Sequence, residues 1–231
     1  MRIFLCGDVM TGRGIDQVLP DPCSPIIHEN YVESALDYLY LAEQANGPVP
    51  RPAEFSYIWG AALDEWNRAQ PHARIINLET SITRSDTYEP KGINYRMSPE
   101  NARTLAVAGV DCCALANNHV LDWGRPGLLD TLNTLEQMHI KTAGAGRNLV
   151  QAKAAAILEV PEERGRLLVL AFASTTSGTP RDWAAEPETA GVNLLTSLSE
   201  ATVTAITAQL AQMRRPRDVV IVSVHWGPNW G

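Results

Sequence analysis

Short apolar runs alternate with amphipathic segments along the chain, and this alternation predicts strands interleaved with helices. The runs that predict strands lie at residues 2–7, 74–78, 111–116, 154–160, 167–173 and 219–224. Helical spacing of apolar residues is found at residues 26–45, 55–69, 99–108, 127–138 and 196–213. Because the two kinds of element alternate, we expect an α/β fold, with a layered β-sheet arrangement flanked by helices.

The apolar runs also bear on where the protein resides. The longest, 167–173 and 219–224, are far shorter than the roughly 18 residues that indicate a membrane span. At the N-terminus, Asp8 interrupts the sequence before the apolar region of a secretory signal could develop. No C-x-x-C pair occurs among the four cysteines, Cys6, Cys23, Cys112 and Cys113. We therefore expect no membrane span, reduced and buried thiols, and a cytoplasmic location.

Charge and chain punctuation narrow the picture further. The chain has 231 residues, with 26 acidic against 19 basic side chains and a net charge of −7, which argues against a protein that coats nucleic acid. Proline-rich breaks at residues 20–25 and 47–52 bracket helical patterns. We expect residues 1–231 to form a single domain, with a helical insertion at about residues 20–70 covering one edge of the site.

Ionisable side chains lie at the ends of several predicted strands. Asp8, Glu79, His119 and His225 occupy such positions, and Asn118 lies beside His119. In α/β folds, chemistry collects in the loops beyond the carboxyl ends of the strands. Carboxylate, amide and imidazole donors form a mixed oxygen and nitrogen set that suits Mn, Fe or Zn. The residues therefore predict metal-assisted hydrolysis, in which two metals clamp a phosphoester and a histidine protonates the leaving group.

Each of these residues also has a structural alternative. Asp8 could cap the turn after the first strand, and Glu79 could pair with Arg84 or with another surface charge. Asn118 is a common turn residue, and either histidine alone could be a structural side chain. Their shared position at strand ends favours the functional interpretation.

Other candidate motifs are weaker. His28, His72 and His139 lie away from strand ends, and we expect them to be structural or solvated. Residues 144–146 resemble the opening of a dinucleotide-binding turn, but no third glycine follows at the required spacing. This segment predicts a tight turn.

Six segments occur in an order that resembles a known family. They are GDVMTGRG (7–14), NLETSIT (77–83), KGINYRMSPEN (91–101), ALANNHVLDWG (114–124), TAGAGRN (142–148) and HWGPNWG (225–231). Their order is similar to that in the CapA proteins, the poly-γ-glutamate capsule synthesis family, which is a branch of the calcineurin-like metallophosphatase superfamily. The resemblance covers essentially the whole chain. It implies a metallophosphatase-like β-sheet sandwich and a role in poly-γ-glutamate capsule biosynthesis.

The resemblance also implies roles for individual residues. Asp8 would bind a first divalent metal, Glu79 would take the place of a bridging aspartate, and Asn118 and His225 would bind a second metal. One or two ions of Mn, Fe or Zn are thus the expected cofactors.

The catalytic pair follows from the same comparison. His119 would stand where the superfamily keeps its leaving-group acid, and Asp122 would orient that imidazole. A carboxylate hydrogen-bonded to an imidazole fixes its tautomer and raises its basicity, which agrees with this spacing.

Three departures from the superfamily pattern affect the metal site. Val9 and Met10 follow Asp8 without the usual D-x-H histidine, and Glu79 replaces an aspartate, as in the CapA branch itself. The family's final G-H-x-P-H motif has no counterpart within residues 1–231. We therefore expect the C-terminal part of the domain to be missing from this sequence.

Basic residues near these motifs suggest an anionic substrate. Arg13, Lys91 and Arg96 could supply cations to a phosphoester or to poly-γ-glutamate, or could belong to solvated loops. Three functional hypotheses result: a metal-dependent hydrolase, a non-catalytic polymer-handling or assembly protein with the same fold, and a scaffold whose site is degenerate.

Overall fold

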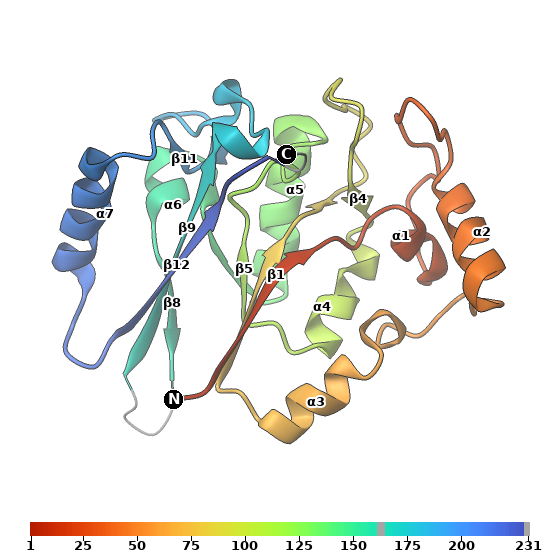
Figure 1. Cartoon of the computed structure of the whole chain (residues 1–231), viewed down its shortest axis with the longest axis horizontal. Coiled ribbons are helices and arrows are strands. Elements are labelled where there is room, and N and C mark those ends of the chain that lie inside the picture. The colour runs from red at the N-terminus through yellow and green to blue at the C-terminus, as the bar shows by residue number, and fades with distance from the viewer. Residues whose placement is uncertain (161–164, 229–231) are drawn as a thin grey trace.

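Two four-stranded sheets form the centre of the computed structural model, which describes residues 1–160 and 165–228 (Figure 1). The first sheet has the order β1-β2-β5-β6 with every pairing parallel. Its strands are β1 (Ile3–Val9), β2 (Ala73–Leu78), β5 (Cys112–Ala114) and β6 (Lys141–Ala143). The predicted α/β class is confirmed.

The second sheet is mixed and packs against the first. Strand β9 pairs in parallel with β11 and β12 and antiparallel with β8. Its strands are β8 (Ala156–Glu159), β9 (Arg166–Ser174), β11 (Leu194–Leu195) and β12 (Val219–His225). Strands β5 and β6 contact β8 and β9, which joins the two sheets. Two small pairs complete the strands: β3 (Ser81–Ile82) with β4 (Arg96–Met97), and β7 (Ala145–Gly146) with β10 (Gly191–Val192).

Helices lie around the sheets, with α1 and α2 at one end of the view in Figure 1 and α7 at the other. The α-helices are α1 (Gly14–Val18), α2 (Ala35–Asn46), α3 (Ala62–Ala69), α4 (Arg103–Val107), α5 (Gly124–Gln137), α6 (Leu149–Lys153) and α7 (Glu200–Met213). Short 3-10 turns are η1 (Tyr57–Trp59), η2 (Glu100–Ala102), η3 (Thr175–Ser177) and η4 (Arg181–Trp183). Within residues 1–160 and 165–228, every helix falls short of the length and apolarity that a bilayer crossing needs.

The helix predicted at residues 26–45 is wrong in its first half. Helix α2 begins at Ala35, because the Ser34 hydroxyl accepts a hydrogen bond from the Leu36 amide and caps it. The preceding residues form a turn held by a bridge between Ile26 and Ser34, and this turn buries Glu29. A buried carboxylate needs a partner of opposite charge, and the turn places Glu29 beside Arg13.

The helix predicted at residues 55–69 is interrupted. The 3-10 turn η1 ends at Trp59 and is followed by Gly60, whose φ of 49° lies in the left-handed region that glycine enters at no steric cost. Helix α3 then begins at Ala62. The remaining helix and strand predictions agree with the structure to within a few residues at their ends.

Burial differs sharply between central and edge strands. In β2, β5 and β9 nearly every residue is buried, together with Leu105 of α4 and Leu128 and Leu135 of α5. Strand β1 has a partner on one side only, and its middle residues are exposed. The expectation of a buried Cys6 is therefore wrong, whereas Cys23, Cys112 and Cys113 are buried, and all four cysteines are free thiols.

Candidate active site

Four side chains of the predicted set meet at the carboxyl ends of parallel strands. Asp8 is the penultimate residue of β1, Glu79 directly follows β2, and Asn118 lies in the loop after β5. His225 is the last residue of β12, in the second sheet. The motif that begins with His225 runs on to residues 229–231, which lie outside the described residues. The two sheets thus each contribute to one cluster, as the rule for parallel strand ends predicts.

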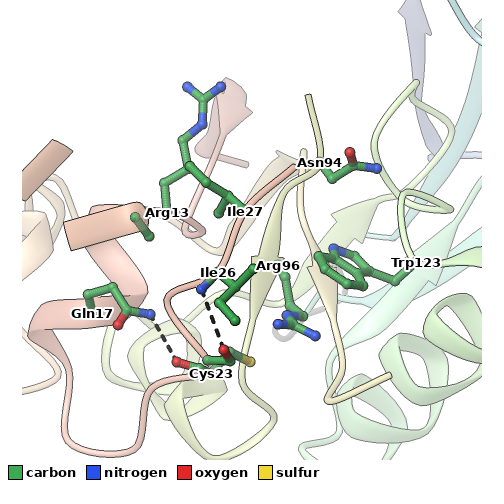
Figure 2. A pocket seen from close by; sticks show the side chains of 10 residues that line it. Arg13, Gln17, Cys23, Ile26, Ile27, Asn94, Arg96 and Trp123 are labelled. Carbon is green, nitrogen blue, oxygen red and sulfur yellow. Dashed lines mark hydrogen bonds between the residues drawn. The ribbon is translucent and has the colours of Figure 1, made fainter. Parts of the chain in front are cut away.

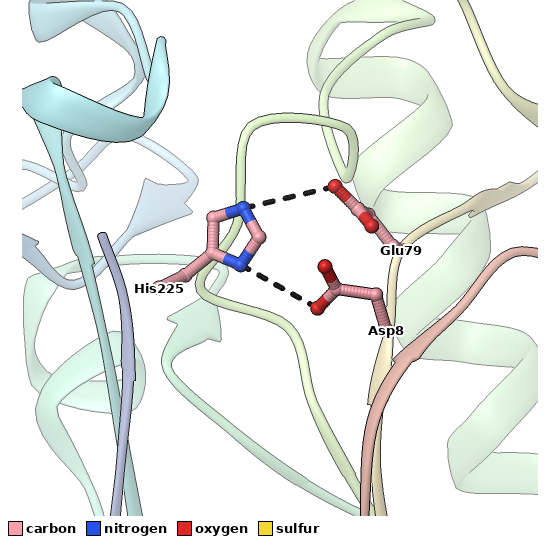
Figure 3. A group of neighbouring side chains, drawn as sticks. All are labelled: Asp8, Glu79 and His225. Carbon is pink, nitrogen blue, oxygen red and sulfur yellow. Dashed lines mark ion pairs between the residues drawn. The ribbon is translucent and has the colours of Figure 1, made fainter. Parts of the chain in front are cut away.

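Asp8, Glu79 and His225 face one another closely enough to share a cation (Figure 3). His225 Nδ1 lies 3.7 Å from Asp8 Oδ1, and His225 Nε2 lies 3.7 Å from Glu79 Oε1. One ligand atom from each of the three lies within 4.8 Å of the other two. Two carboxylate oxygens and one imidazole nitrogen form a donor set that suits Mn, Fe or Zn.

Asn118 adds a fourth donor to this cluster. Its Oδ1 lies 2.9 Å from His225 Nε2. Two ligand atoms that each lie about 2.1 Å from one ion, at a right angle, are about 3 Å apart, so this spacing fits neighbouring ligands. In the absence of an ion, the Nε2–H group donates a hydrogen bond to Asn118 Oδ1. Binding an ion through Nε2 would therefore require the other tautomer, with the ring proton on Nδ1.

The charges of the cluster are unbalanced without a cation. Burial raises the pKa of Glu79 to about 8, and the negative charge of nearby Asp8 adds to the rise. Burial also lowers the pKa of His225, although Asp8 opposes this change. Both pKa shifts disfavour the charged form of a partly buried side chain, and a divalent cation would reverse the effect on Glu79.

Two asparagines hold the ligands in place, and the sequence interpretation did not single them out. Asn77 Nδ2 donates to Asp8 Oδ1 at 2.5 Å, and Asn117 Nδ2 donates to Asn77 Oδ1 at 3.0 Å. Asn117 Oδ1 also accepts from the backbone amide of His119 at 3.0 Å. Their presence inside the NLETSIT and ALANNHVLDWG motifs was the available signal.

His119 and Asp122 form a buried pair beside the cluster. His119 Nδ1 lies 2.7 Å from Asp122 Oδ2, and His119 Nε2 lies 3.8 Å from Glu79 Oε1. The carboxylate therefore holds one ring nitrogen while the other faces the candidate metal ligands. Burial lowers the pKa of His119, and the hydrogen bond that His119 donates to Asp122 opposes that change.

Lys91 contacts this pair directly. Its Nζ lies 2.7 Å from Asp122 Oδ1 and 3.4 Å from His119 Nδ1, and it also donates to the backbone oxygen of Asn118. The Asp122 side chain is fully buried, so Lys91 supplies the positive charge that a buried carboxylate requires. Lys91, which the sequence predicted to bind the substrate, thus lies within the site, and its ammonium group already contacts protein atoms.

Arg13 belongs to a stack of side chains that ends on His119. Its guanidinium carbon lies 4.6 Å from the centre of the Tyr38 ring and 4.8 Å from that of Tyr95. The Tyr95 ring stacks on His119 with 4.0 Å between centroids. Arg13 also forms an ion pair with buried Glu29 at 2.6 Å.

The structure places Arg96 away from the candidate metal ligands. It is 8% exposed, its guanidinium carbon lies 3.8 Å from the Trp123 ring centre, and its Nη1 donates to the backbone of Ser85. Figure 2 shows Arg96 and Trp123 in a small pocket from which the Arg13 guanidinium points away. Arg84, which the sequence offered as a surface partner for Glu79, instead forms an ion pair with Glu100 at 2.9 Å.

Comparison with known proteins connects this chain to capsule synthesis proteins. A sequence model described as "Bacterial capsule synthesis protein PGA_cap" matches residues 2–231. A Mycobacterium tuberculosis protein described as "Probable polyglutamine synthesis accessory protein" is 41% identical over 233 residues, which cover all of this chain and 61% of the relative. The chain therefore spans about three fifths of that relative's length.

More distant relatives have related descriptions. The "PGA biosynthesis protein CapA" of Bacillus subtilis is 25% identical over 156 residues, covering 67% of this chain and 38% of the relative. The "Capsule biosynthesis protein CapA" of Bacillus anthracis is 26% identical over 149 residues, covering 61% of this chain and 32% of the relative.

Proposed function

The chain belongs to the bacterial capsule synthesis protein PGA_cap family, which includes the CapA proteins, and from this premise we propose that it is a divalent-metal-dependent hydrolase of the metallophosphatase type. The family and the names of its relatives link the chain to capsule and polyglutamate synthesis. The proposed substrate is an anion, either a phosphoester or poly-γ-glutamate.

One observation carries the proposal: the candidate metal-ligand cluster lies next to the buried pair of His119 and Asp122. Asp8, Glu79 and His225 offer ligand atoms within 4.8 Å of one another, and His119 Nε2 lies 3.8 Å from Glu79. A bound divalent ion polarises a phosphoryl or acyl oxygen and lowers the pKa of an attacking water. Metal ligands beside a positioned acid are what hydrolysis of a phosphoester requires.

The residues of the chain divide the work between them. Asp8, Glu79, Asn118 and His225 would hold the metal. His119, when protonated, gives its Nε2 proton to the leaving oxygen and becomes a neutral imidazole. Asp122 keeps the other ring proton on Nδ1, which leaves Nε2 facing the reacting group.

Lys91 and Tyr95 act on this pair as positioning residues. Lys91 holds one oxygen of Asp122, and the Tyr95 amide donates to the other at 2.6 Å. The Tyr95 ring covers one face of the imidazole. The orientation of His119 is thereby fixed before substrate binds.

Hydrolysis of an aryl phosphate by the purified chain with Mn²⁺ tests the proposal. Removing a proton donor costs about 10²- to 10⁴-fold in rate, so His119→Asn should lose that much of kcat. The matched control is His139→Asn, since His139 is exposed and lies outside the cluster. Absence of turnover with Mn²⁺, Fe²⁺ or Zn²⁺ would contradict the proposal.

The non-catalytic alternative is favoured by the names of the relatives, which refer to synthesis rather than cleavage. A polymer-handling protein would bind poly-γ-glutamate without shortening it. The net charge of −7 opposes binding of this polymer in either function, because like charges repel over the whole surface. Incubating the chain with the polymer and Mn²⁺, then measuring both co-sedimentation and polymer length, separates the two functions.

A further inference from the structure

A large apolar cleft lies between α1, α2 and the turn η1, on the far side of Arg13 from His119. Its volume is about 640 Å³, which is within the roughly 300–1,000 Å³ range of small-molecule sites. The walls are mainly aliphatic and aromatic and include Met10, Tyr38, Leu39, Val49, Tyr57 and Trp59. Nothing in the proposed hydrolysis uses this space.

Arg13 is the one charged side chain among the described residues that line the cleft. Its guanidinium carbon lies 4.6 Å from the ring centre of Tyr38, a cleft wall, and 4.8 Å from that of Tyr95. Tyr95 in turn stacks on His119. The cationic end of the cleft is therefore the end that adjoins the candidate active site.

Glu29 occupies only part of the hydrogen-bonding capacity of Arg13. The Arg13 Nε–H donates to Glu29 Oε1 at 2.6 Å, while the Tyr38 hydroxyl donates to Glu29 Oε2 at 2.5 Å. Nη2 is buried and contacts Glu29 as an ion pair, but it makes no hydrogen bond to a described residue. A guanidinium has five N–H donors; Nε is used and Nη2 is enclosed, so the two N–H groups of Nη1, for which no described residue is an acceptor, are the ones that remain for an anion.

We propose that this cleft binds the apolar part of an amphipathic phosphate ester, whose phosphate lies on the Arg13 side toward the active site. The inference rests on the proposed hydrolase function and narrows its substrate class. The apolar part is an alkyl chain or an aromatic ring, because both fit walls of this composition. A fully hydrophilic polymer would not gain from burial there, since its polar groups would lose water without finding partners.

Calorimetric titration of the metal-free chain tests the cleft separately from catalysis. The probes are inorganic phosphate, butyl, hexyl and octyl phosphate, phenyl phosphate, and octanol as a neutral ligand. Each buried methylene contributes about 0.8 kcal/mol, so affinity should rise about fourfold per added methylene until the cleft is filled. Comparing phenyl with hexyl phosphate shows whether a ring or a chain is preferred.

A variant that fills the cleft provides the structural control. Ala42 lines the cleft from an exposed position on α2, so Ala42→Trp should fold normally and remove the dependence of affinity on chain length. The matched variant is Ala45→Trp, on the same helix but outside the lining, which should bind as the parent does. Thermal melts of both variants verify their folding.

Three outcomes would overturn the inference. Equal affinity for butyl and octyl phosphate would show that no apolar group enters the cleft, and unchanged octyl phosphate binding by Ala42→Trp would place the ligand elsewhere. Octanol binding as tightly as octyl phosphate would remove the anionic requirement. Because no metal or turnover is involved, a failure of the hydrolase proposal alone would leave the chain-length dependence intact.

Discussion

The two histidines of the candidate site lie in contrasting surroundings. His119 belongs to a buried side, together with Asp122 and Lys91, whereas His225 belongs to an edge side, together with Asp8. The Asp122 side chain is fully buried and that of Asp8 is 55% exposed. On the buried side each charged group has a partner of opposite charge. On the edge side, Asp8 accepts a hydrogen bond from the neutral Asn77 amide, and the ionisable group that faces both carboxylates is the His225 imidazole.

The strands beneath the two sides explain the difference. The buried side follows β5, a central strand whose residues are all buried, and precedes α5, which packs into the core. The edge-side residues Asp8 and His225 lie at the ends of β1 and β12. Each of these strands leaves apolar residues in solvent, such as Leu5 at 56% and Val222 at 43% exposed. Folding alone fixes the buried side, whereas we propose that the edge side binds a cation, which would balance the charge of its carboxylates.

The largest expected effect separates the two sides by matched substitutions. Asp122→Asn leaves Lys91 without its partner and sets an amide N–H against the donors around it, which should lower the free energy of unfolding by about 3 kcal/mol. Asp8→Asn removes a carboxylate that repels Glu79, so the metal-free stability should be unchanged or slightly higher. Urea unfolding in the presence of EDTA measures both. Equal destabilisation by the two variants would break the comparison.

The next effect is stabilisation by metal, which should belong to the edge side. An ion that binds the folded chain at 100 times its dissociation constant adds about 2.7 kcal/mol to the free energy of unfolding. Mn²⁺ should therefore raise the melting temperature of the parent chain but not that of Glu79→Gln, which loses a ligand charge. Asp122→Asn starts from a lower melting temperature and should keep the full metal-induced increase. Loss of that increase in Asp122→Asn would show that the sides are coupled.

A smaller effect concerns Lys91, which joins the buried side. Lys91→Met leaves the Asp122 carboxylate with the Tyr95 amide and His119, and it should cost about 1–2 kcal/mol of stability. Because the Lys91 charge lowers the pKa of His119, the pH profile of kcat in this variant should move toward higher pH. A merely structural role would change the melting temperature without moving the profile. An unchanged profile would therefore limit Lys91 to packing.

The sequence predicted which residues come together but not what surrounds them. Asp8, Glu79 and His225 could be grouped in advance because parallel strands present their carboxyl ends on one rim, and the structure brings them within reach of one ion. Their roles as ligands remain predictions. The contact of Lys91 with Asp122 joins a loop to a site 31 residues away, and no periodic pattern encodes such a pairing.

The errors in the helical region have a related cause. Apolar spacing at residues 26–45 favours one long helix, but burial of Glu29 against Arg13 draws the first part of this segment into a turn. Similarly, the apolar run of β1 suggests a buried thiol at Cys6, yet burial depends on whether both faces of the strand are covered. Tertiary partners decide these cases, and they are not local properties of the sequence.

The smallest expected effect concerns the anchor of the edge side. Asp218 immediately precedes β12 and accepts hydrogen bonds from Arg166 Nε at 3.1 Å and Nη2 at 2.5 Å, which ties the start of β12 to the start of β9. The Arg166 guanidinium lowers the pKa of Asp218 to about 2. Since the folded pKa lies below the ordinary value near 3.9, this ion pair stabilises the chain fully above about pH 4, and its contribution is lost as the pH falls toward 2.

Asp218→Asn should therefore flatten the fall of the urea midpoint between pH 4 and pH 2, whereas Asp37→Asn, on the exposed face of α2, should leave that fall unchanged. If Asp218→Asn also kept the parent's slope, this ion pair would not stabilise the start of β12, and the position of His225 would depend on the strand pairing with β9.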